Sequence, residues 1–191
     1  ADGTPEIIVT GANRVFRQRD GKFVGARLAK YLPTDCTAAV LADLNGDGHA
    51  DLFAVPHERP PLWIPGNTKG EFDASPFLVA VRASPMGRAL ACSAADIDGD
   101  GDLDVWVTQN RPAGQGGRMP TPYWDANDGH PAYLLMNDGK GNFSEVTIPA
   151  GLAAKRGRRV TASALIDLDG DLDNDLVMAS EYAGLDIFYN N

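Results

Sequence analysis

Short hydrophobic runs alternate with turn residues along the whole chain of 191 residues. Runs such as LFAV at 52–55, VWV at 105–107 and YLLM at 133–136 are separated by segments rich in Gly, Asn, Asp and Pro. Runs of this length and composition are typical of β-strands. No segment carries a convincing apolar stripe at helical spacing with caps. The pattern therefore predicts an all-β chain of short strands.

Three segments align without gaps and reveal an internal repeat. They are DLNGDGHADLFAV at 43–55, DIDGDGDLDVWVT at 96–108 and DLDGDLDNDLVMA at 167–179. Each follows a run of small and apolar residues and precedes a further strand with its turn, in LWIPGNTKGEF, YLLMNDGKGNF and, cut short, DIFYNN. Repeats of about 50 to 70 residues with four short strands each are typical of β-propeller blades.

We expect one propeller segment over residues 1–191, with about three to four blades. The predicted limits are a partial blade at 1–35, a blade at 36–88, a blade at 89–158 with an insertion at 111–131, and a partial blade at 159–191. The stretch DGTPEIIV at 2–9 matches the end of an acidic segment and its strand. The chain is therefore expected to be part of a longer protein, with the ring completed by missing sequence or by a partner chain.

The charge is concentrated in the repeats. The formal net charge is −9, and half of the 26 Asp and Glu residues lie at 43–51, 96–104 and 167–175. This balance argues against nucleic acid or an anionic membrane surface as a partner. The apolar runs are too short to predict a membrane span. Local acid density of this kind favours cation binding.

The three acidic segments share the pattern D-x-[DN]-x-D-x-x-x-D. Calcium takes six to eight oxygen ligands, and alternating acids on a tightly turning backbone point several oxygens inward. We therefore predict three Ca²⁺ sites, with side-chain oxygens from positions 1, 3, 5 and 9 and the main-chain carbonyl of position 7. The predicted ligands are Asp43, Asn45, Asp47, His49 and Asp51; Asp96, Asp98, Asp100, Asp102 and Asp104; and Asp167, Asp169, Asp171, Asp173 and Asp175.

The two alternatives to this interpretation are an EF-hand and acidic surface turns without metal. An EF-hand would need a glutamate at position 12 and a following helix, but position 12 is Ala54, Val107 or Met178 within β-rich runs. Acidic surface turns without metal would bring several carboxylates together without compensation. The third segment differs from the others in having Leu172 where they have glycine, and a positive φ there would strain the site.

These motifs resemble the FG-GAP/VCBS repeat family, through D-x-[DN]-G-D-G-x-x-D followed by a hydrophobic strand and through YLLMNDGKGNFSEVTIPAGL between the loops. The resemblance implies an integrin-α-like, calcium-binding β-propeller in an extracellular or periplasmic setting. It does not imply one activity, because members resemble adhesion receptors, lectins, lyase domains and accessory subunits.

The face opposite the calcium loops is predicted to bind the ligand. Of the 17 Lys and Arg residues, 11 fall on or beside that face, and one loop there, 111–131, is much longer than the others. Tyr and Trp are amphipathic side chains that recognition surfaces often use. The predicted role is recognition of a protein or carbohydrate, with an anionic ligand favoured. The candidate ligand-binding residues are Arg111, Arg118, Tyr123, Trp124, Arg156, Arg158 and Arg159.

An enzymatic role and a structural role remain as alternatives. Asp125, Asp128, Glu181 and Tyr182 fall on neighbouring loops of the same face, where paired carboxylates could serve a polysaccharide lyase or hydrolase. A permanent accessory subunit of a larger extracellular assembly is the other alternative. Cys36 and Cys92 do not occupy equivalent repeat positions, and the sequence leaves their pairing open.

Overall fold

The computed structural model describes residues 5–81, 87–111, 119–120 and 122–191. Within these residues the strands form four separate antiparallel sheets, which confirms the all-β prediction. The first sheet holds β1 (Ile7–Val9), β2 (Arg14–Arg19) and β3 (Lys22–Arg27); the second holds β4 (Cys36–Ala42), β5 (Asp51–Pro56), β6 (Leu62–Ile64) and β7 (Phe77–Leu78); the third holds β8 (Arg88–Ala95), β9 (Asp104–Asn110), β10 (Tyr133–Asn137) and β11 (Phe143–Glu145); the fourth holds β12 (Val160–Ile166), β13 (Asp175–Ser180) and β14 (Gly184–Phe188). Two 3₁₀ helices, η1 (Thr10–Ala12) and η3 (Leu152–Lys155), lie between strands.

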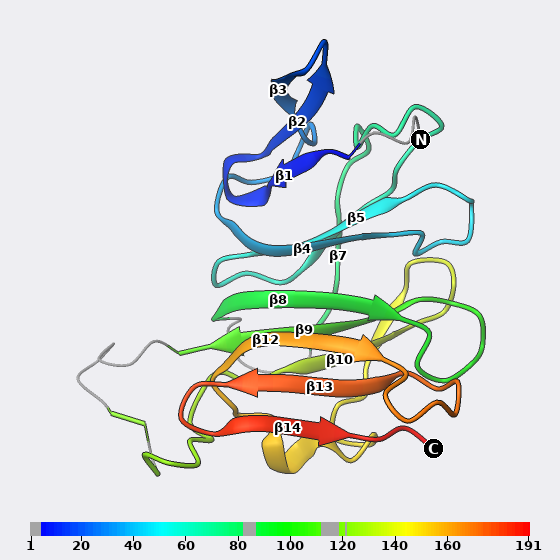
Figure 1. Ribbon diagram of the computed structural model, residues 1–191. Helices are drawn as coiled ribbons and strands as arrows, with labels where there is room; N and C mark the ends of the chain where they lie inside the picture. The colour runs from blue at the N-terminus through cyan, green and yellow to red at the C-terminus, as the bar shows by residue number, and fades with distance from the viewer. Residues whose placement is uncertain (1–4, 82–86, 112–118, 121) are drawn as a thin grey trace.

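Each sheet is a meander whose strands pair in chain order. The sheets follow one another through space in the same order, with β8 lying between β4 and β12 (Figure 1). A bulge interrupts the first strand pair at the same point in the second, third and fourth sheets. The described strands thus form successive propeller blades in an open arc, with the first and last sheets at opposite ends.

The hydrophobic core is divided into three clusters, one at each junction between neighbouring sheets. The first junction lies between the first and second sheets, the second between the second and third, and the third between the third and fourth. β5 and β9 are buried along their whole length. Strands covered on both faces read as continuous hydrophobic runs, which explains LFAV and VWV. Trp63 and Trp106 are buried in this core.

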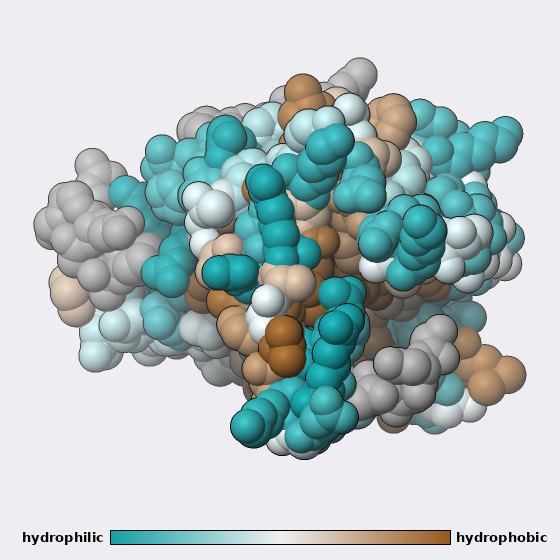
Figure 2. Space-filling model, turned by 90° about the horizontal axis from the view of Figure 1, so that it is seen from above, coloured by the Kyte–Doolittle hydropathy of each residue, from teal (hydrophilic) through white to brown (hydrophobic). Residues whose placement is uncertain are grey.

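The end of the arc formed by β1–β3 is less completely covered. Ile7, Val9, Phe23 and Val24 are exposed on these strands. Figure 2 views the molecule from this end and shows a mostly hydrophilic surface with hydrophobic residues between the polar ones. A blade packed on both faces would bury such residues, so the first sheet has an open face.

The antiparallel topology places two sets of loops at opposite ends of the strands. The acidic segments connect β4 to β5, β8 to β9 and β12 to β13, whereas residues 111–131 connect β9 to β10 at the other end (Figure 1). Position 12 of each acidic segment lies inside a strand, which confirms that these are not EF-hands. Cys36 and Cys92 are both free thiols.

Candidate metal sites and an aromatic loop

The three acidic segments, named loop 1 (43–51), loop 2 (96–104) and loop 3 (167–175), are held by the same hydrogen bonds. The position-9 aspartate is almost fully buried at the start of the second strand. One of its oxygens accepts the N–H of position 2, and the other accepts an N–H at the end of the third strand of the blade or just after it. The donors are Leu44 and Gly66 for Asp51, Ile97 and Asn137 for Asp104, and Leu168 and Asn190 for Asp175, at 2.8–3.0 Å.

Inside each loop, main-chain N–H groups orient the remaining acids. The position-6 N–H donates to the carboxylate of position 1 at 2.8–3.2 Å. The N–H of position 5 donates to position 3 at 2.9–3.3 Å, and that of position 7 donates to position 5 at 2.8–3.0 Å. The same network in three loops shows that the side chains are positioned by the backbone.

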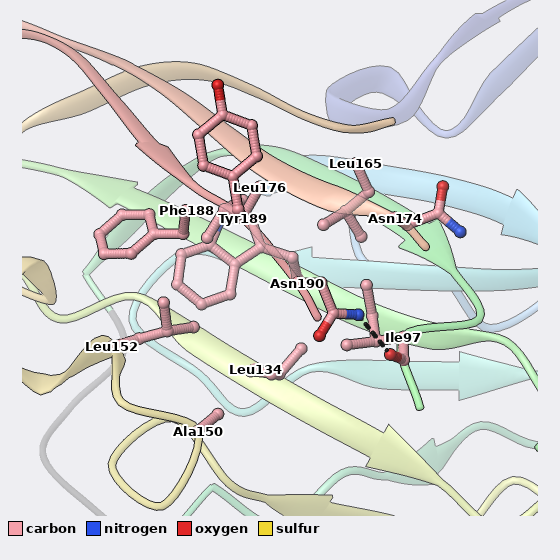
Figure 3. Close-up of a pocket in the computed structure, with 11 residues that line it drawn as sticks. Ile97, Leu134, Ala150, Leu152, Leu165, Asn174, Leu176, Phe188, Tyr189 and Asn190 are labelled. Atoms are coloured by element: carbon pink, nitrogen blue, oxygen red, sulfur yellow. Dashed lines mark hydrogen bonds between the residues drawn. The ribbon is translucent and has the colours of Figure 1, made fainter. Parts of the chain in front are cut away.

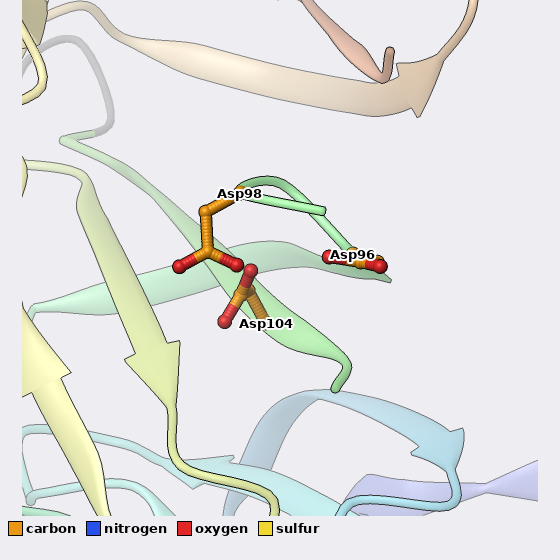
Figure 4. A group of neighbouring side chains, drawn as sticks. All are labelled: Asp96, Asp98 and Asp104. Carbon is orange, nitrogen blue, oxygen red and sulfur yellow. The ribbon is translucent and has the colours of Figure 1, made fainter. Parts of the chain in front are cut away.

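Loops 2 and 3 bring three carboxylates together. One oxygen from each of Asp96, Asp98 and Asp104 lies within 4.8 Å of the others, and the same holds for Asp167, Asp169 and Asp175. Figure 4 shows the loop 2 carboxylates turned toward one another. In loop 1 the corresponding positions are Asp43, Asn45 and Asp51, so one ligand is an amide oxygen.

This donor set fits a hard divalent cation. Calcium–oxygen distances are about 2.3–2.6 Å, so two oxygens on one ion lie no more than about 5 Å apart. The oxygens of loops 2 and 3 satisfy that limit. Both triads can therefore hold a metal ion.

Position 6 adopts a left-handed backbone in all three loops. Gly48 and Gly101 have φ values of 83° and 94°, and Leu172 has a φ of 80°. Glycine takes this conformation freely, whereas a side chain with a β-carbon is strained in it. Loop 3 therefore carries the strain that its sequence predicted, although the Leu172 side chain itself is exposed.

Burial and mutual repulsion raise the pKa of several loop acids. Desolvation is the main cause that raises the pKa of Asp104 to about 6, and the nearby charges of Asp98 and Asp100 raise it further. The two N–H groups that donate to Asp104 lower its pKa, but by less than these effects raise it. The pKa of Asp51 is raised in the same direction, mainly by burial. Ionising such groups costs free energy unless a cation is present, so metal and proton compete for them.

Asparagines connect the loops to the next blade, a feature that the sequence analysis missed. The side chain of Asn137 donates to the Leu44 carbonyl of loop 1 at 2.7 Å, and that of Asn190 donates to the Ile97 carbonyl of loop 2 at 2.7 Å (Figure 3). Asn137 is the last residue of β10 and Asn190 follows β14, so both stand at the end of the third strand of the next blade. This repeated position is the signal that could have identified them. Order in a loop is therefore coupled to packing between blades.

Two candidate ligand-binding arginines are buried rather than exposed. Arg158 and Arg159 are each 1% exposed. Arg158 pairs with Asp186 at 2.8 Å and Asp125 at 2.6 Å, and Arg159 makes a bidentate pair with Asp128 at 2.9 and 3.0 Å. The prediction that they present charge to a ligand was wrong, because carboxylates far away in the sequence cover both guanidinium groups.

The other basic candidates are also engaged or lie elsewhere. Arg156 lies over the Tyr133 ring, with Nη2 3.4 Å from a Glu145 carboxylate oxygen. The Arg111 carbonyl accepts a hydrogen bond from Arg159. Arg118 lies outside the described residues. The described part of this face therefore offers no cluster of free arginines from the candidate set.

Arg158 and Arg159, which lie just before β12, hold the long loop through their ion pairs with Asp125 and Asp128. The N–H of Gly129 donates to the Gly157 carbonyl at 2.7 Å, and the side chain of Asn127 donates to the Ala154 carbonyl at 2.8 Å. A β-carbon on Gly129 would lie 2.8 Å from the Arg158 carbonyl oxygen, so only glycine permits this close approach. The second half of the loop is thus anchored by the ion pairs of the buried Arg158 and Arg159, which we call the ionic base.

Above that base lies a group of aromatic side chains, which we call the aromatic shelf: Tyr123, Trp124 and Tyr182. Trp124 is 80% exposed, and Tyr123 is 58% exposed. The Tyr123 and Tyr182 rings lie 5.3 Å apart. Tyr182 has a φ of 64°, a strained conformation for a side chain of this size. The carboxylates considered for catalysis, Asp125 and Asp128, instead pair with Arg158 and Arg159.

Because the raised pKa of Asp104 places its titration near pH 6, calcium binding to loop 2 should weaken as the pH falls through that value. The stability of the ion-free protein should instead rise as the pH falls from about 6 to about 4. The reason is that the raised pKa of Asp104 makes its ionised form costly in the folded state, and protonation removes that cost. Thermal melts with and without calcium should therefore differ much more at pH 7.5 than at pH 5. An equal difference at the two pH values would contradict this assignment.

Leu172→Gly should stabilise the fold by up to about 1 kcal/mol, because it removes a left-handed strain of about 1–2 kcal/mol, offset by up to about 1 kcal/mol from the freer unfolded chain. The expected result is a melting temperature higher by a few degrees, measured in calcium. Gly101→Leu is the reciprocal control in loop 2, where an added β-carbon meets no atom within 4 Å. It should lower the melting temperature through the backbone alone, and unchanged melting temperatures in both variants would refute the strain argument.

The comparisons with known proteins agree with this architecture. A family model described as FG-GAP-like repeat matches residues 1–54 and 43–107, which together cover more than half of the chain. No curated protein matches the chain. The matched regions include loop 1, loop 2, the whole of β5 and the first part of β9. This chain therefore belongs to the FG-GAP-like repeat family.

Proposed function

We propose that this chain is a calcium-stabilised propeller module that binds a neutral saccharide on the aromatic shelf. The observation that carries the proposal is the combination of an 80% exposed Trp124 with a rigid ionic base beneath its loop. Rigid aromatic side chains on a pre-organised surface lose little conformational entropy when they bind a ligand. The role proposed here is recognition rather than catalysis.

Calcium is the proposed ion at all three loops. The ligands are carboxylate, amide and carbonyl oxygens, which suit calcium better than softer metals. Charge repulsion among the acids of each loop favours an ion that neutralises them. Sites of this type in extracellular modules have dissociation constants of about 10⁻⁴–10⁻³ M, so we propose an extracellular or periplasmic location with millimolar calcium. None of the helices in the described residues is long and apolar enough to cross a membrane.

Because Arg158 and Arg159 are buried, the ligand proposed for this face is neutral rather than anionic. With Arg158 and Arg159 paired internally, the shelf is bordered by the half-exposed carboxylate of Asp125 and by Glu181. The paired guanidinium groups are not available to an anionic ligand, whereas the carboxylate oxygens accept hydrogen bonds from hydroxyl groups. Aromatic faces offer apolar contact with polar tips nearby. A neutral sugar chain provides both complementary features, and an anionic ligand does not.

The blade limits also stand as a proposal. We assign residues 1–35, 36–88, 89–158 and 159–191 to successive blades, with the insertion at 111–131 serving recognition. Further sequence or a partner chain completes the ring around the described arc. In that arrangement the calcium loops support the fold at one end, and the ligand binds at the other.

Trp124→Ala and Tyr123→Ala should each weaken binding to neutral polysaccharides at least tenfold, since a truncated anchor aromatic typically costs about 2 kcal/mol or more. Binding is measured by affinity electrophoresis across neutral and anionic glycans. Tyr189→Ala is the matched control, because Tyr189 is 55% exposed and Tyr123 is 58% exposed. Equal losses for Tyr123→Ala and Tyr189→Ala, or selective binding of anionic glycans, would refute the shelf as a neutral saccharide site.

A further inference from the structure

The hairpin formed by β2 and β3 differs from the rest of the molecule in the sign of its charge. Residues 14–27 contain five basic residues and one acidic residue, whereas the whole chain has a formal net charge of −9. The basic residues are Arg14, Arg17, Arg19, Lys22 and Arg27. The hairpin projects at one end of the arc (Figure 1), and the view of that end shows a mostly hydrophilic surface (Figure 2). A locally basic surface on an acidic protein favours a partner of negative charge.

Most of this positive charge is not neutralised within the molecule. Arg17 pairs with Glu6, but among the residues that the structure describes none of the other four cations forms an ion pair. Arg19 and Lys22, which stand on either side of the turn, are both exposed. Two acidic residues line a cleft at the base of the hairpin, Glu71 and Asp73. The uncompensated charge is therefore clearest near the turn.

The outer edge of β3 is free for a further strand. β3 pairs with β2 on one side and is the last strand of its sheet among the described residues. It follows a turn that contains glycine, as β7 and β11 do in the next two sheets, so it is the outermost strand of its blade. β7 and β11 span two and three residues, whereas β3 spans six, all of them exposed. Short outer strands discourage edge pairing, so β3 is the one of these three best able to accept a partner strand.

The turn determines which main-chain groups of β3 point outward. Asp20 and Gly21 have φ values of 50° and 72°, as a two-residue type I′ turn requires. Arg19 and Lys22 close this turn as a hydrogen-bonded pair, and such pairs alternate with non-bonded pairs along an antiparallel ladder. The residues of β3 whose N–H and C=O groups point away from β2 are therefore Phe23, Gly25 and Arg27.

The base of the hairpin is fixed by hydrogen bonds. The buried Asn13 side chain donates to the carbonyls of Ala29 and Leu32 and accepts the Ala29 N–H, each at 2.9 Å. The Arg27 Nε donates to the same Ala29 carbonyl at 3.1 Å. Ala29 also forms a parallel bridge with Phe72, in the segment before β7. An edge that is already ordered loses little conformational freedom when it binds.

We propose that β3 binds an extended, acidic segment of a partner protein as an added outer strand. Main-chain hydrogen bonds to the free edge provide affinity, and acidic side chains beside the basic hairpin provide selectivity. The same basic residues oppose pairing of β3 with a second β3, because like charges would face each other. Phe23 and Val24 are exposed and offer apolar contact. A peptide suits this edge better than a sulfated polysaccharide, which lacks the repeating main-chain groups that pair with a strand.

The experiment uses two fluorescent peptides of equal charge, EEVTVEE and EEPTPEE, and the calcium-loaded chain at low salt, where charge attraction is least screened. Proline removes main-chain donors, so the second peptide forms no strand ladder. Binding is measured by fluorescence anisotropy, and hydrogen exchange of the β3 amides locates the bound peptide.

Two pairs of matched variants separate the main chain from the charge. Phe23→Pro removes an outward N–H together with the side chain, whereas Phe23→Ala removes the side chain alone. Arg19→Glu reverses a charge on the hairpin, whereas Arg88→Glu reverses an exposed charge on β8. Thermal melts of all four variants verify that they fold.

EEVTVEE should bind about tenfold more tightly than EEPTPEE, because only EEVTVEE makes the main-chain hydrogen bonds, and it should protect the Phe23 and Gly25 amides. Arg19→Glu should weaken this binding about threefold or more, and Arg88→Glu should leave it unchanged. Phe23→Pro should weaken it more than Phe23→Ala does.

Equal binding of the two peptides, equal losses in Arg19→Glu and Arg88→Glu, or no binding of EEVTVEE at about millimolar concentration would each overturn the proposal. Heparin that binds in place of the peptide, and still binds Phe23→Pro, would overturn it in favour of an anionic polysaccharide. A dimer that forms in EGTA and protects β3 would overturn it in favour of the acidic loops of a second copy.

Discussion

The position-9 aspartate is the group on which the rest of each blade depends. Asp51, Asp104 and Asp175 are buried, and each accepts two main-chain N–H bonds, one from its own loop and one from the end of the third strand or just after it. A buried carboxylate is tolerated only when it is well satisfied. The same group thus closes the loop, fixes the register of the third strand and offers an oxygen to a cation.

The two ends of the blades differ in how far their charges are paired, and this difference suits them to different roles. At the loop end, acids gather with few counter-charges, and burial raises the pKa of Asp104 to about 6, so a cation stabilises the arrangement. At the opposite end, Lys155, Arg158 and Arg159 pair with Asp125, Asp128 and Asp186. A cation would relieve the repulsion at the first end, whereas the charges of the second end are paired internally and its aromatic side chains are exposed.

Repetition explains how much of this structure the sequence predicted. The D-x-[DN]-x-D pattern recurs in three copies, so the loops, the strands after them and the strain at Leu172 could all be identified. The partners of Arg158 and Arg159 could not, because Arg159 pairs with Asp128 in the unrepeated insertion and Arg158 pairs with Asp186 on β14, 31 and 28 positions away in the sequence. Asn137 and Asn190 were missed although they do repeat, since their hydrogen bonds cross between blades and appear only once the blades are placed together.

The central claim is that the three loops bind calcium and that the fold depends on those ions. The most direct measurement is native mass spectrometry of the chain during a calcium titration, combined with thermal melts in calcium and in EGTA. The account predicts about three ions per chain and a melting temperature that rises strongly with calcium, as mass action requires for an ion that binds only the folded state. A chain that binds no calcium and melts at the same temperature in EGTA would contradict it.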